Sequence, residues 1–63
     1  MYDSDEDIIL KAYAEAKLAA FEKGLSGMQA IQAVMAATAK VASRVLGRDI
    51  TIGHVEDVLR QAQ

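Results

Sequence analysis

The residues of this chain that could carry out chemistry are few, and three of them lie together. His54, Glu56 and Asp57 fall within one helical turn, and His54 and Asp57 have the i, i+3 spacing that places two side chains on one helix face. Two ligands do not complete a metal site, and the sequence contains no other histidine and no cysteine. We therefore expect no bound metal and interpret these residues as the exposed first turn of a helix, where carboxylates interact favourably with the helix dipole.

The remaining polar residues also lack the partners that catalysis needs. The serines have no neighbouring general base, and Ser4 and Ser26 stand where helix caps are expected. The acidic run at residues 3–7 lacks the glycine and the ligand spacing of a calcium loop. We predict a protein that is not an enzyme and that binds no cofactor.

The composition bounds the class of protein. The 63-residue chain is 52% hydrophobic, 12 of its residues are alanine and proline is absent, which favours closely packed helices over a thick core. Below about 70–80 residues a single core seldom stabilises a fold without disulfides, a metal or a partner chain. Because cysteine is absent, we expect a partner chain to supply that stability.

Helix start and stop signals divide the chain into three segments. Ser4, Ser26 and Thr51 stand at N-cap positions, and Gly24 and Gly47 follow last turns as C-terminal glycines. The glutamine three residues after Ser26 gives it the S-x-x-Q spacing of a capping box. The prediction is an all-α fold with one three-helix domain over 1–63: an antiparallel helical hairpin at about 5–23 and 27–46, and a short third helix at about 52–62.

The second and third segments each show one apolar face. In the second, apolar residues at three- and four-residue steps predict a single buried side made of Ile31, Val34, Met35, Thr38, Val41, Ala42 and Val45. The opposite face is predicted to point outward and holds Gln29, Gln32, Ala33, Ala36, Lys40, Ser43 and Arg44. The third segment is expected to cover the hairpin with Ile52, Val55, Val58 and Leu59.

The first segment is apolar over most of its circumference. One stripe holds Ile9, Tyr13, Ala16 and Ala20, and a second beside it holds Leu10, Ala14, Phe21 and Leu25. One neighbouring helix cannot cover both stripes. We therefore predict a helical homodimer or a complex with another protein, formed through Leu10, Tyr13, Leu18 and Phe21.

Three basic residues give a second candidate surface. Lys40, Arg44 and Arg48 repeat at four-residue spacing around the end of the second segment. Cations there stabilise a helix C-terminus, and the same strip could dock an acidic partner or phosphates. In an antiparallel hairpin the strip also lies beside the acidic start of the first helix, so the two charged ends could neutralise each other.

A short pattern at the junction of the first two segments carries a family resemblance. Ala20, Gly24, Leu25 and Ser26 follow the order Ala-x-x-x-Gly-hydrophobic-Ser. This resembles the turn of helix-turn-helix DNA-binding proteins, in which the following helix enters the major groove. The resemblance implies a small DNA-binding regulator, but residues 24–39 contain no lysine or arginine to hold phosphates, so we rank nucleic acid below protein as a partner.

A second resemblance covers the end of the chain. Gly47-Arg48, Thr51-Ile52 and Glu56-Asp57-Val58 are similar to the loop and last helix of histone-fold proteins. That resemblance implies obligate dimerisation, with Arg48 and Thr51 as phosphate contacts.

The function that the sequence favours is protein–protein binding. With a net charge of -2 and an acidic start, we expect a small cytoplasmic regulator, inhibitor or adaptor whose partner is a second copy, another protein or both. The alternative is a DNA-binding regulator that uses either resemblance. No run of 18 apolar residues is present, so we expect neither a transmembrane helix nor a signal peptide, and no membrane partner.

Overall fold

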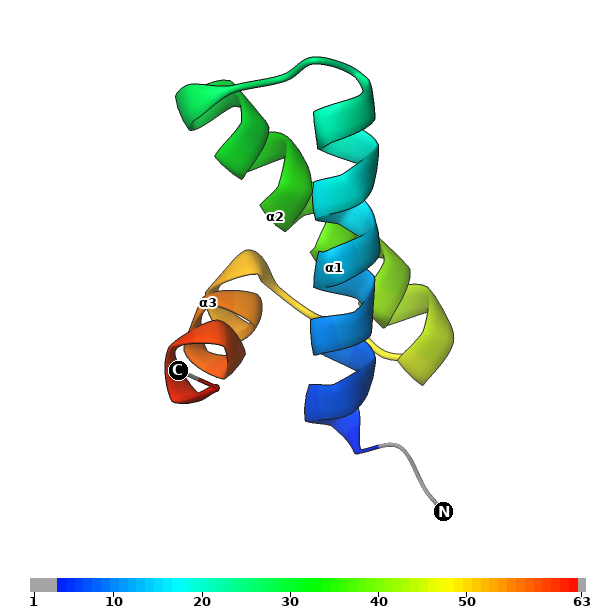
Figure 1. The fold of residues 1–63 in the computed structure, drawn as a ribbon. Coiled ribbons are helices and arrows are strands. Elements are labelled where there is room, and N and C mark those ends of the chain that lie inside the picture. The colour runs from blue at the N-terminus through cyan, green and yellow to red at the C-terminus, as the bar shows by residue number, and fades with distance from the viewer. Residues whose placement is uncertain (1–3, 63) are drawn as a thin grey trace.

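A computed structural model describes residues 4–62 and shows three helices joined by short loops (Figure 1). They are α1 (Asp5–Glu22), α2 (Gly27–Leu46) and α3 (Ile52–Gln61). The prediction of an all-α fold is confirmed, and each predicted helix boundary agrees with the structure to within one residue.

The first and third helices begin at the side-chain caps that the sequence indicates. The amide of Asp7 donates to Ser4 Oγ over 3.1 Å, and the Asp7 carboxylate accepts from the Ser4 amide over 3.4 Å, which completes a capping box. Thr51 Oγ1 accepts from the amide of His54 over 3.1 Å at the start of α3. Gly47 ends α2 with φ +70°, a left-handed conformation that glycine adopts without a steric penalty.

The start of α2 differs from its prediction. Ser26 is the N-cap residue, yet its hydroxyl makes no capping hydrogen bond, so the predicted capping box is wrong. The next residue, Gly27, has φ +63°. This left-handed backbone lies outside the right-handed helical region, so the first turn does not present its amides to the serine as a regular turn would.

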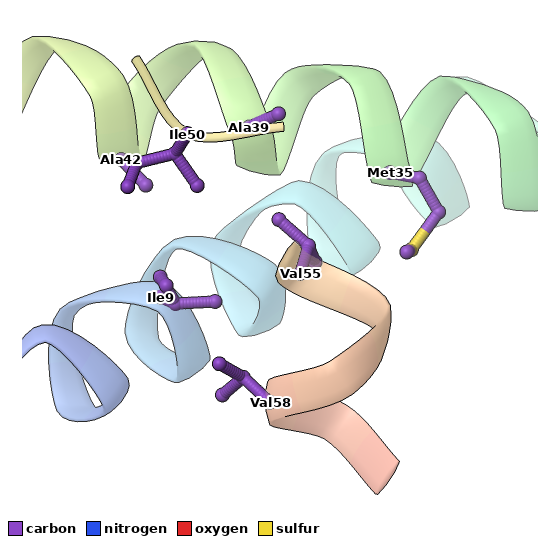
Figure 2. Packing of buried hydrophobic residues seen from close by; sticks show 7 residues of the cluster. All are labelled: Ile9, Met35, Ala39, Ala42, Ile50, Val55 and Val58. Carbon is purple, nitrogen blue, oxygen red and sulfur yellow. The ribbon is translucent and has the colours of Figure 1, made fainter. Parts of the chain in front are cut away.

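The hairpin of α1 and α2 carries α3 on one side (Figure 1). The α2 helix returns past α1 and crosses it obliquely, and α3 lies beside the half of the hairpin that contains the start of α1. Every helix and the α2–α3 loop contribute to the core, which Figure 2 shows and which consists of Ile9, Met35, Ala39, Ala42, Ile50, Val55 and Val58.

The buried face of α2 is narrower than its periodicity predicts. Val34, Met35, Thr38 and Ala42 are buried as expected, with Ala39 beside them. Three residues that were expected on the same buried side are exposed, namely Ile31, Val41 and Val45. The α3 helix does not extend far enough to cover Ile31. Val41 and Val45 lie on the flank of α2 away from the main core.

The α2–α3 loop is held to both helices of the hairpin. Ser43 was predicted to face outward, but its hydroxyl accepts from the amide of Ile50 over 2.8 Å and donates to the Ile50 carbonyl over 3.3 Å. Arg48 forms an ion pair with Asp5 at the start of α1. These contacts fix the loop so that Ile50 enters the core and α3 follows across the hairpin.

Candidate protein-interaction surface

The four residues predicted to meet a partner fall into two groups. Leu10 and Tyr13 are half-buried and pack against the core. Leu18 and Phe21, on the later turns of α1, are 60% and 80% exposed. Of the four predicted residues, only the two on the second half of α1 are therefore left uncovered by the other residues of the described range 4–62.

The two predicted stripes of α1 also differ in burial. In the first stripe Ile9 and Ala20 are buried, while Tyr13 and Ala16 are half-buried, so this stripe faces the rest of the bundle. In the second stripe Phe21 is exposed, whereas Leu10 is packed against the core.

An open apolar groove lies beside Phe21, between the second half of α1 and the first half of α2. Its volume is about 210 Å³, and all but one of its lining residues are apolar or aromatic: Tyr13, Lys17, Ala20, Phe21, Leu25, Ala30, Ile31, Val34 and Met35. Tyr13 and Met35 also belong to or pack against the core. The groove is therefore a continuation of the core that opens to solvent.

The length of α3 explains why this groove is open. The α3 helix has 10 residues, whereas α1 has 18 and α2 has 20, so it spans about half of the hairpin at 1.5 Å per residue. Val58 of α3 points toward Ile9 of α1, and Val55 of α3 points toward α2 (Figure 2); all three belong to the core. Met35 lies at the limit of this covered region, and Ile31, one turn earlier on α2, is 58% exposed.

The α2 side of this surface was missed by the sequence interpretation. Met28 is 70% exposed at the start of α2, close in the chain to Ile31. The predicted helix lengths could have indicated that these residues are exposed. A third helix of about ten residues cannot cover the full length of two helices about twice as long.

One charged residue, Lys17, lines the groove. The Lys17 ammonium lies 5.5 Å from the centroid of the Tyr13 ring, a cation–π arrangement that holds this lysine at the groove edge. Glu22 and Lys23, which follow Phe21 directly, are exposed. The lining of the groove is therefore apolar or aromatic apart from Lys17, and the exposed charges of Glu22 and Lys23 are not part of it.

A second depression lies on another flank of the hairpin. Its volume is about 300 Å³, and it is lined by Ile8, Lys11, Ala12, Glu15, Val41 and Val45. Val45 is 61% exposed there, but Lys11 and Glu15 place charge inside the depression. It is the more polar of the two surfaces and has no exposed aromatic residue.

The predicted basic strip is divided. Lys40 and Arg44 are exposed on α2, and neither forms an ion pair among residues 4–62. The Arg48 guanidinium instead binds Asp5, so the expected neutralisation between the two charged ends of the hairpin occurs within one chain.

The other sequence candidates lie in separate places. His54, Glu56 and Asp57 are exposed on α3, Asp57 pairs with Arg60 over 3.3 Å, and residues 4–62 contain no group of three or more potential metal ligands. In the helix-turn-helix-like pattern, Ala20 is buried, Gly24 has φ +76°, Leu25 is half-buried and Ser26 is exposed.

Comparisons with known proteins give no assignment. The chain matches no protein-family model, and no curated protein and no solved structure shows significant similarity to it. Within the part of the chain that the structure describes, no helix has both the length and the apolar character needed to cross a membrane.

Proposed function

We propose that this chain is a small, non-enzymatic cytoplasmic interaction protein that acts by protein–protein binding as a homodimer. The surface that binds is the end of the hairpin, with Leu18 and Phe21 from α1 and Met28 and Ile31 from α2. The observation that carries the proposal is Phe21, which is 80% exposed beside an open apolar groove. Large apolar patches of this kind on a small protein mark interaction sites.

The small core supports the same proposal. The core cluster has seven residues, and two of them are alanine, so the apolar area buried within one chain is limited. Covering the hairpin end with a second chain would remove four large apolar side chains from water. This mechanism suits a regulator, inhibitor or adaptor, because binding itself blocks or links the partner surfaces.

Analytical ultracentrifugation of the wild-type chain over a range of concentrations tests the proposal. We expect a dimer, and we expect Phe21→Asp or Leu18→Asp to raise its Kd at least about tenfold, because each places a charge in the apolar centre of the interface. Val45→Asp is the matched control, since Val45 is as exposed as Leu18 but lies in the other depression. A wild-type chain that stays monomeric at high concentration would exclude the homodimer.

A further inference from the structure

We draw no further inference here: the strongest candidate, the open apolar groove between the second half of α1 and the first half of α2, belongs to the surface already described, and nothing in the structure shows what covers it.

Discussion

The two halves of the helical hairpin have similar apolar patterns but opposite surroundings. In the half beside α3, Ile9 is fully buried between helices. In the half beside the α1–α2 turn, Ile31 has a comparable position on the inner side of its helix but is 58% exposed. The periodicity of the sequence is the same in both halves, so the difference is caused by the third helix, which covers one half only.

Under the proposed function, the covered half supports the fold and the uncovered half supports binding. Substitutions in the covered half should change the free energy of unfolding of one chain. Substitutions in the uncovered half should change association and leave the unfolding of one chain nearly unaltered.

The largest expected effect comes from comparing the same substitution in the two halves. Ile9→Ala removes a fully buried side chain and should lower the free energy of unfolding by about 2–5 kcal/mol. A single core of this size supplies about 3–5 kcal/mol in total, so much of the protein should unfold. Urea denaturation followed by circular dichroism measures the change.

Ile31→Ala is the control for Ile9→Ala. Both positions are helical, so the gain in helix propensity is the same and the difference between them reports burial. At protein concentrations below the dimer Kd, Ile31→Ala should change the free energy of unfolding by less than about 1 kcal/mol. Equal losses at the two positions would contradict the division into a folding half and a binding half.

A smaller effect is expected where the covering helix is attached. Ser43→Ala removes the hydroxyl that bonds both the amide and the carbonyl of Ile50, and leaves these backbone groups without that partner. The expected loss is about 1–3 kcal/mol. Thermal denaturation measures it, and amide hydrogen exchange at Ile50 should accelerate. An unchanged exchange rate at this amide would show that the loop is held by other contacts.

The helix caps provide the next comparison. Thr51→Ala removes a capping hydrogen bond from α3 and should cost about 1 kcal/mol. Ser26→Ala at the start of α2 should lower the free energy of unfolding by only about a few tenths of a kcal/mol, because the Ser26 hydroxyl makes no such bond. Chemical denaturation of both variants measures the pair, and a larger loss for Ser26→Ala would contradict the irregular first turn of α2.

The smallest expected effect concerns the ion pair between the loop and α1. Arg48→Ala should lower the free energy of unfolding by at most about 1 kcal/mol, since the side chains of Arg48 and Asp5 are about half-exposed. The loss should shrink in about 1 M salt, where charges are screened over a few ångströms. Arg44→Ala, which removes a cation that has no ion-pair partner in residues 4–62, should show no comparable loss.

The helices were predictable because their signals are local. Ser4, Thr51 and Gly47 act on backbone groups within a few residues of themselves, so their roles can be deduced from sequence spacing. Ser26 has the same local spacing, but the left-handed conformation of Gly27 changes the geometry that spacing assumes.

The candidate interaction surface was only partly predictable because exposure depends on distant parts of the chain. Leu18 and Phe21 were identified from the width of the apolar surface on α1, whereas Met28 and Ile31 were not. Whether Ile31 is buried depends on how far α3 extends, and whether Ser43 faces solvent depends on how the following loop returns. Periodicity within one helix contains neither piece of information.

The position of α3 in the chain also has a consequence for the order of folding. The α1–α2 hairpin is closed by a loop of only a few residues, whereas the ion pair that ties the α2–α3 loop to α1 joins residues 43 positions apart. Because long-range contacts carry a larger loop-closure cost, we expect the hairpin to form before α3 docks. During that interval the apolar surface formed by α1 and α2 is uncovered along its whole length. The α3 helix is then the first element to cover part of it.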